Sequence, residues 1–265
     1  MCTVTIVGLP GEGPGAFRFA CNRDELRTRR PARPPVAGRF GPRSGLHPVD
    51  ADAGGTWVGA NDAGLVLSLL NLNLPEPPPQ EGPLASRGAI IPALLHHESV
   101  ADAIVDAVEI DPAGQKPFRL VLADRRERAL LRGDGHRVEL VERSEHLGPF
   151  MVTSSGLGDH LVESPRRQLF ERMLLDPSLD PESLPAAQDA FHRSHWPDRG
   201  HLSVSMVRPD AWTLSHTLVT VTPAGVSMAY RAGVPHEPAV AETTGVIEPA
   251  RRRPAARSAA ARTAG

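Results

Sequence analysis

The alternation of apolar and polar positions predicts a β-hairpin at the start of the chain. In "MCTVTIVG", Cys2, Val4 and Ile6 occupy alternate positions, and after the turn residues "PGEGPG" the segment "AFRFACNRDE" alternates again. Such a period of two is typical of strands with one buried face. The pattern therefore places the Cys2 thiol on the face of Val4 and Ile6, toward a core or a cleft.

A loop, a second hairpin and two helices are expected next. Residues 26–55 are rich in Arg, Pro and Gly, and we expect a long irregular loop there. The segment "GGTWVGANDAGLVLSLLN" predicts a second hairpin, whose last strand ends at Asn71. Apolar residues at helical spacing predict one helix over 86–97 and another after Ser99, which with Asp102 forms a capping box.

The second half of the chain returns to strands, then helices, then strands. Strand patterns occur in "FRLVLAD", "RALLRG", "RVELVER" and "PFMVTSS". Ser164 and Pro165 then predict the start of a helix through Leu175, a further helix is expected over 181–195, and three more strands follow. This order lacks the regular strand–helix alternation of a parallel sheet. It predicts an α+β fold of two antiparallel sheets packed face to face, with helices outside.

Composition narrows the classes of function. Apolar residues make up 40% of the 265 and charged residues make up 23%. The net charge of −2 gives no overall reason to expect a nucleic-acid partner or binding to an anionic membrane, although weak attraction of the basic C-terminal segment to anionic surfaces stays open. No segment has the length of a membrane span, and the first residues lack the basic flank of an export signal. Two cysteines do not form a disulfide framework, so a cytoplasmic location is expected, although a Cys2–Cys21 bridge stays open.

The end of the chain differs from the rest. Residues 1–235 are expected to form a single domain, whereas residues 236–265 have almost no large apolar side chains. Such a segment buries too little surface to offset the entropy lost on ordering. A disordered basic tail is therefore predicted, and its last part carries five arginines, Arg251, Arg252, Arg253, Arg257 and Arg262.

Cys2 is the first candidate for chemistry. Aminopeptidases remove an initiator methionine when the next residue is small, so the mature chain is expected to begin with Cys2. Its α-amine would titrate near 8 and its thiol near 8.5, so the amine can accept the thiol proton at neutral pH. A cysteine nucleophile needs such a base. The alternative is that Cys2 is only a small buried residue of a strand.

Two polar residues could assist this nucleophile. Asp24 could orient the amine of Cys2, and Asn71 could donate its amide N–H to an oxyanion. Asn22 and Asp24 share one face of their strand, while Arg23 lies on the other together with Cys21. Arg23 and Asp24 could instead form a structural ion pair.

The chain resembles the NRDE family, whose eukaryotic members are the transport and Golgi organisation proteins of the second type. The resemblance rests on "MCT", on the tetrapeptide Asn22-Arg23-Asp24-Glu25 in "FACNRDE", and on "GGTWVGANDAGLVLSLLN". It implies the fold of N-terminal nucleophile hydrolases, a four-layer αββα sandwich. It also implies a relation to amidases with an N-terminal cysteine, in which Cys2, Asp24 and Asn71 match the nucleophile, an aspartate and the oxyanion asparagine.

This sequence also departs from the amidase pattern. Cys21 stands where those amidases have an arginine, and Arg23 follows two residues later. Ser154 or Ser155 stands where a further asparagine is expected, and Arg208 is a counterpart of their late arginine. Cys2, Asp24, Asn71 and Arg23 are therefore the catalytic candidates.

The remaining candidates concern ligands. Asn22, Ser154 and His216 are candidates for substrate binding, although a histidine such as His216 is more often a core residue. The histidines lack the spacing of metal ligands, and His96 and His97 are expected to point apart on a helix. Neither a metal nor a cofactor is therefore expected.

Two functions follow from these residues. The first is an N-terminal-cysteine hydrolase that cleaves a non-peptide amide bond through an acyl thioester, with a small-molecule amide or lipid-like substrate. The second is a carrier without enzymatic activity that holds an apolar ligand, haem or a lipid, on the same fold. Cys21 in the place of the amidase arginine is the observation that motivates the carrier.

Overall fold

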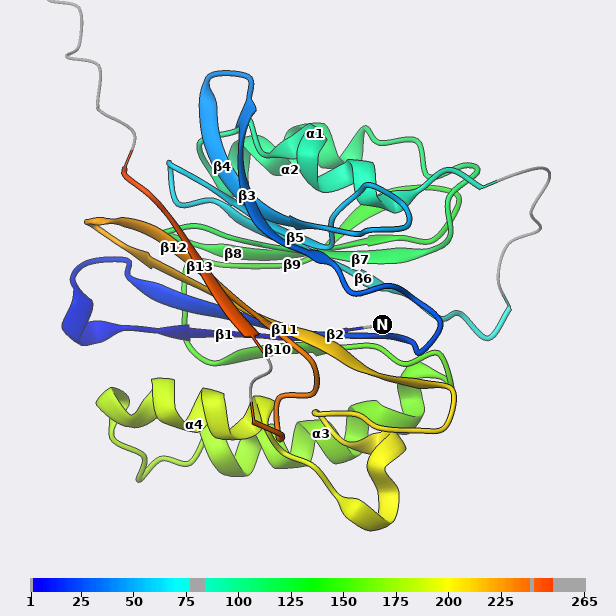
Figure 1. The fold of residues 1–265 in the computed structure, drawn as a ribbon. Coiled ribbons are helices and arrows are strands. Elements are labelled where there is room, and N and C mark those ends of the chain that lie inside the picture. Colours follow the sequence, from blue (N-terminus) through cyan, green and yellow to red (C-terminus); the bar gives the residue numbers. More distant parts are fainter. Residues whose placement is uncertain (1, 77–83, 239–240, 250–265) are drawn as a thin grey trace, which may run out of the picture.

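Four layers build the protein (Figure 1). The computed structural model describes residues 2–76, 84–238 and 241–249. Two antiparallel sheets lie face to face, and helices cover the outer face of each sheet. The expected α+β class and the four-layer αββα sandwich are therefore confirmed.

The first sheet contains the N-terminal strand in its interior. Its six strands have the order β10-β1-β2-β11-β12-β13. Their bounds, in that order, are Phe150–Thr153, Cys2–Gly8, Phe17–Leu26, Ala211–Thr222, Gly225–Ala232 and Ala241–Ile247. β1 pairs with β2 on one side, with Cys2 opposite Arg23, and with β10 on the other side. Both sides of β1 are thus hydrogen-bonded, which fixes the position of residue 2.

The second sheet is a meander in which each strand pairs with the next one in the sequence. Its seven strands have the order β3-β4-β5-β6-β7-β8-β9. Their bounds are Arg33–Phe40, Arg43–Val49, Val58–Asn61, Val66–Asn71, Phe118–Ala123, Arg128–Gly133 and Val138–Ser144. The predicted second hairpin corresponds to β5 and β6. Gly64 in its turn has a φ of 91°, a conformation that glycine adopts without strain.

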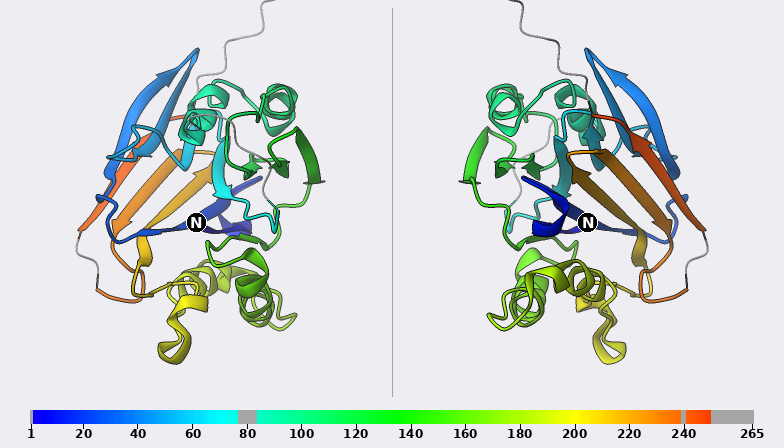
Figure 2. Two further views of the ribbon diagram at one scale, coloured as in Figure 1. Left: turned by 90° about the vertical axis from the view of Figure 1, so that its right-hand side faces the viewer. Right: turned by 90° about the vertical axis from the view of Figure 1, so that its left-hand side faces the viewer.

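Two pairs of α-helices form the outer layers, as the end-on views show (Figure 2). α1 (Ile90–Leu94) and α2 (Val100–Val108) cover the seven-stranded sheet, while α3 (Asp159–Leu174) and α4 (Leu184–His192) cover the six-stranded sheet. The Ser99 hydroxyl accepts a hydrogen bond from the N–H of Asp102, which confirms the predicted cap of α2. The short 3-10 helices are η1 (Pro10–Glu12), η2 (Arg87–Ala89), η3 (Pro181–Ser183) and η4 (Pro197–Leu202).

Three apolar clusters hold the layers together. The largest lies between the sheets and contains Cys2, Val4 and Ile6, as the alternation predicted. The second lies between the seven-stranded sheet and α1 and α2, and the third between the six-stranded sheet and α3 and α4. Each fully buried Leu, Ile or Phe side chain contributes about 1.5–3 kcal/mol through removal from water. The site described below is therefore built on packed strands.

Two segments expected to be irregular are strands. β3 and β4 fall within the predicted loop 26–55, and β13 falls within the predicted tail 236–265. β3 and β13 are largely exposed edge strands held by backbone pairing, so no apolar alternation marks them in the sequence. The predictions of a loop and of a tail were wrong for these residues. Residues 250–265, with the five arginines, lie outside the described residues.

The helix boundaries also differ from the prediction. α3 begins at Asp159, so Ser164 and Pro165 lie inside the helix rather than at its start. The helix tolerates the backbone hydrogen bond lost at proline because one stripe packs on the sheet. That stripe consists of Val162, Arg166, Phe170 and Leu174. The segments 86–97 and 181–195 each divide into a 3-10 turn and a shorter α-helix.

Among the described residues, no helix combines the length and the apolar character that crossing a membrane requires.

Candidate active site

A pocket of about 230 Å³ opens beside the first residue of β1. We call it the Cys2 pocket. Its wall includes Cys2, Arg23, Asp50, Trp57, Asn71 and Arg87. These side chains come from β1, β2, β6, the segment between β4 and β5, and the segment before α1. Three of the four predicted catalytic residues, Cys2, Arg23 and Asn71, thus lie on one pocket.

Strand pairing fixes the backbone of Cys2. Its N–H donates to the Ser154 hydroxyl at 3.1 Å, and its carbonyl accepts from the Ser154 N–H at 2.9 Å. The Cys2 residue is 3% exposed, although it reaches the pocket wall. Ser154, a predicted substrate-binding residue, therefore holds the nitrogen of Cys2 and is not part of the pocket wall.

The thiol of Cys2 has a second thiol as its neighbour. Cys21 lies on the same face of the sheet and donates a hydrogen bond to the Cys2 sulfur, which lowers the pKa of Cys2 despite its burial. The same hydrogen bond raises the pKa of Cys21. Both cysteines are free, so the disulfide that the sequence left open is not formed. A thiolate at Cys2 is the nucleophilic form of cysteine.

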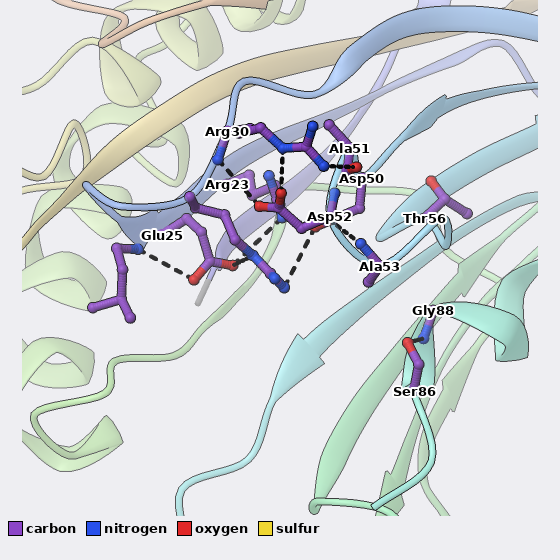
Figure 3. Close-up of polar contacts among 12 residues, drawn as sticks. Arg23, Glu25, Arg30, Asp50, Ala51, Asp52, Ala53, Thr56, Ser86 and Gly88 are labelled. Carbon is purple, nitrogen blue, oxygen red and sulfur yellow. Dashed lines mark hydrogen bonds and ion pairs between the residues drawn. The ribbon is translucent and has the colours of Figure 1, made fainter.

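Arg23 is held at the pocket by an acidic residue that the sequence did not indicate. Its guanidinium forms an ion pair with Asp50 and lies 3.4 Å from Glu25 (Figure 3). It also lies over the Trp57 ring, with its central carbon 4.2 Å from the ring centroid. The Arg23 Nη1 atom is buried and has no hydrogen-bond partner. The Nη1 group of Arg23 is therefore available as a hydrogen-bond donor, while the rest of the guanidinium is held in place.

Asp50 shapes the segment between β4 and β5, which forms part of this wall. One carboxylate oxygen accepts hydrogen bonds from the N–H groups of Asp52 and Ala53, each at 2.9 Å, and the other meets Arg23. Asp50 thus joins the turn after β4 to β2. The only sequence signal for this role is the turn composition of "DADAGG".

Asp24 points to the opposite face of β2, toward α3. Its carboxylate accepts a hydrogen bond from the Thr213 hydroxyl at 2.7 Å, and Arg166 lies 3.9 Å away. Burial raises the pKa of Asp24, and the Arg166 charge opposes that shift. Arg23 and Asp24 therefore do not pair with each other, and the ion pair considered from the sequence is replaced by two separate ones.

Asn22 also faces the helices. Its side-chain oxygen accepts from the Nδ1 atoms of His192, at 3.0 Å, and His216, at 2.8 Å. Its amide donates to the carbonyls of His192 and Val204, both at 3.0 Å. Neither Asn22 nor His216 lines the Cys2 pocket. His216 instead lines a separate cavity of about 210 Å³ on the α4 side of the sheet, where burial lowers its pKa to about 3.

A model of the Transport and Golgi organisation 2 family matches residues 1–174. The chain belongs to this family. The resemblance seen in the sequence is thus confirmed over the part of the chain that carries Cys2, the NRDE tetrapeptide and Asn71. No curated protein matches the sequence.

Solved structures show where this family member stands among known folds. Penicillin V acylase from Agrobacterium tumefaciens is 14% identical with a TM-score of 0.54, over 94% of this chain and 86% of that one. The C2A mutant of conjugated bile acid hydrolase from Clostridium perfringens is 14% identical with a TM-score of 0.51, over 94% and 92%. The Caenorhabditis elegans N-acylethanolamine-hydrolyzing acid amidase ortholog is 13% identical with a TM-score of 0.51, over 89% and 94%. At these identities the likeness shows a shared fold.

The chain contains a buried arginine that sequence analysis missed. Arg166 donates to the hydroxyls of Thr3 and Thr153 and to the carbonyls of Leu202 and Ser203. It thus ties β1 and β10 to α3 behind Cys2. Its place in the apolar stripe of α3, at intervals of four residues, is the signal that could have found it. Arg208, the residue considered from the family pattern, pairs with Asp210 and does not line the pocket.

One group of side chains in the family member has the composition of a metal site. His96, His97 and Asp106 bring ligand atoms within 4.8 Å of one another, on α2 and just after α1. The centroids of the two histidine rings lie 3.9 Å apart, so the expectation that the side chains point apart was wrong. The rings meet because both lie beyond the last helical turn of α1. None of the three lines the Cys2 pocket.

Proposed function

We propose that the protein is a hydrolase with Cys2 as its N-terminal nucleophile, acting on a non-peptide C–N amide bond. The observation that carries the proposal is the free Cys2 thiol on a pocket wall, with the nitrogen of the same residue held by Ser154. A thiol and a base on one residue need no distant histidine. The family membership and the shared fold with amidases support this reaction class.

The reaction would proceed through an acyl thioester. Once Met1 is removed, the amine of Cys2 takes the thiol proton while sulfur attacks the amide carbon, forming the S–C bond. The C–N bond then breaks, and the amine of Cys2 returns the proton to the leaving nitrogen. Water adds to the thioester, giving the carboxylic acid and restoring the thiol. Met1 lies outside the described residues, so its removal stays a prediction.

Each neighbouring residue has a proposed part in these steps. Asn71, at the end of β6 on the pocket wall, would donate to the oxyanion. Preorganised donors of this kind account for about 10²–10³-fold in rate. Asp24 would act from behind β2 as a positioning residue, since its negative charge favours a protonated amine at Cys2. Arg23 has an unused N–H donor for the acyl group or the leaving group.

The proposed location is the cytoplasm, where a reducing environment keeps Cys2 and Cys21 as free thiols. A small-molecule amide fits a pocket of about 230 Å³, which is smaller than the roughly 300–1,000 Å³ of typical ligand sites. The pocket would thus enclose the reacting end of a substrate.

The test is the mass of the intact protein before and after reaction with a β-lactone probe. We expect a mass that lacks Met1, followed by addition of one acyl group to Cys2. The Cys2→Ala variant is expected to stay unmodified, whereas the control Cys21→Ala keeps the label. Retention of Met1, or equal labelling of the Cys2→Ala variant, would rule out the mechanism.

The carrier without enzymatic activity is the second candidate. Cys21, a free buried thiol beside Cys2, is the residue that favours it, because it leaves the amidase arginine without a direct substitute. Spectral titration with haem is the direct test of that ligand. A Cys2→Ala protein with full ligand affinity and full cellular function would favour the carrier over the hydrolase.

A further inference from the structure

We propose that the substrate carries a carboxylate, and that Arg87 and Lys116 on the wall of the Cys2 pocket bind it. This inference names the substrate class for the site and rests on the proposed function. The charge of the pocket wall is its starting point. Four cations, Arg23, Arg29, Arg87 and Lys116, line the pocket, against two carboxylates, Glu25 and Asp50.

Half of these cations are already neutralised. Arg23 pairs with Asp50 and approaches Glu25 at 3.4 Å. Arg29 lies 3.6 Å from Glu25 and 3.5 Å from Asp50. Two arginines and two carboxylates therefore form a closed network of zero net charge. The positive excess of the pocket belongs to Arg87 and Lys116.

Arg87 has a neutral partner only. Its Nη1 atom donates to the carbonyl of Pro117 at 2.7 Å, and no carboxylate within ion-pair distance is found for it among residues 2–76, 84–238 and 241–249. Burial lowers the pKa of Arg87, and the charges that oppose this shift are those of Cys2 and Glu25. A partly buried cation without a counter-ion is costly, and an anion entering the pocket would remove that cost.

Lys116 stands on the same wall. It directly precedes Pro117, the residue whose carbonyl holds Arg87. Lys116 is the only lysine of the chain, whose Lys and Arg together number 29. Within the described part of the chain it forms no salt bridge. A guanidinium and an ammonium that line one pocket can each donate a charge-assisted hydrogen bond to a carboxylate.

The position of these cations selects the kind of amide. Arg87 and Lys116 line the same pocket as Cys2, so a carboxylate bound by them would belong to the molecule whose carbonyl meets the thiol. A neutral amide of the same size would supply no counter-ion to either cation. The pocket therefore favours amides of amino acids or dicarboxylic acids over uncharged amides.

Binding is the first arm of the test, because it does not depend on turnover. The Cys2→Ala protein is titrated by calorimetry with two matched pairs of probes. Phenylacetylglycine and phenylacetylglycinamide differ by a carboxylate on the amine side, and glutaric acid monoanilide and its primary amide differ on the acyl side. We expect the acid of at least one pair to bind at least about tenfold more tightly than its amide, and more weakly as salt is added.

Variants locate the effect. Arg87→Gln and Lys116→Gln in the Cys2→Ala protein are expected to abolish the preference for the acid. Arg137→Gln is the matched control, since the Arg137 side chain is 73% exposed and pairs with Glu139. Equal affinity for acid and amide in both pairs, or an unchanged preference in the two pocket variants, would overturn the inference.

The single lysine allows a second measurement without any variant. Trinitrobenzenesulfonate modifies amines, so in this chain it reports on Lys116 and the N-terminus alone. The preferred acid is expected to slow modification of Lys116, as read by peptide mass, and its amide is not. Unchanged modification of Lys116 would count against the site. Labelling of Cys2 by the β-lactone tests the proposed reaction separately, so the two failures are distinguishable.

Discussion

The two faces of β2 hold polar residues in different states. On the face toward the helices, Asn22 receives two histidine N–H groups and donates to two carbonyls. On the face toward the other sheet, Arg23 keeps a buried N–H without a partner, although it pairs with Asp50. Buried polar groups in proteins are nearly always satisfied, so an unsatisfied one on a pocket wall suggests a place for a ligand.

The difference teaches how one short motif can serve structure and chemistry together. Neighbouring residues of a strand point to opposite faces. In the NRDE tetrapeptide, Asn22 and Asp24 fasten β2 to the helical layer, while Arg23 and Glu25 line the pocket. Substitutions on the helix face should therefore change mainly stability, apart from the effect proposed for Asp24 on the amine of Cys2, and substitutions on the pocket wall should change chemistry.

The largest effect is expected from Arg166→Leu, on the helix face. The change leaves the Asp24 charge buried and removes the donor for two hydroxyls and two carbonyls. We expect a loss of about 3–5 kcal/mol in the free energy of unfolding, measured by chemical denaturation. Arg167→Leu is the control on the same helix, because its side chain is 37% exposed, and should cost less than about 1 kcal/mol. Equal losses for both would contradict the separation of the faces.

The second effect is expected on the pocket wall. Asn71→Ala should lower the rate of acylation of Cys2 by about 10²–10³-fold while the free energy of unfolding stays nearly unchanged. Asn73→Ala, two residues away, is the matched comparison, for which we expect a change in stability rather than in rate. The Asn73 amide donates to Ser155 and Asp159, each at 2.8 Å, so its loss should reduce stability more than the rate. A rate that is unaffected by Asn71→Ala would remove it from the oxyanion site.

A smaller effect concerns pH and the helix face. Burial lowers the pKa of His216 to about 3, whereas an unfolded histidine titrates near 6.5. Between these values the unfolded chain binds more protons, so stability falls as pH falls below about 6.5. We expect His216→Gln, which keeps a donor for Asn22, to reduce the loss between pH 7 and pH 5 by about 2 kcal/mol. An identical pH dependence in both proteins would show that His216 is not responsible.

The smallest effect separates the two thiols. Cys21→Ala removes the hydrogen bond to the Cys2 sulfur, so the pKa of Cys2 should rise and alkylation by iodoacetamide should slow at neutral pH. Cys21→Ser keeps a donor and should stay closer to the original protein. The readout is the midpoint of the pH profile of alkylation. A midpoint that is the same in all three proteins would exclude Cys21 as a donor.

Local sequence patterns predicted those strands and helices that need apolar alternation or a capping residue. The alternation in β1 and β2, the capping box of α2 and the order of strands and helices were visible in the sequence. β3 and β13 were not, because their exposed edges require no apolar alternation. In α3, packing overrode the local signal of Pro165.

The residues of the candidate site also fall into those that the sequence predicted and those that it did not. Cys2, Arg23 and Asn71 were found because they lie on strands with a clear period. Asp50 and Arg87 were not, since they reach the pocket from segments without regular pattern. Ser154 was predicted, but its contact with the nitrogen of Cys2 spans 152 residues of sequence, and only the sheet order reveals it.

This separation in sequence determines when β1 can complete its pairing during synthesis. The first strand leaves the ribosome early, yet one of its two neighbours in the sheet, β10, is made only after nearly 150 further residues. At roughly 5–20 residues per second, this leaves the leading end undocked for about 8–30 s. During this interval the Cys2 side chain, which is 3% exposed in the folded protein, is still open to solvent and to enzymes. The removal of Met1 that we propose would fall in this interval, before β10 pairs with β1.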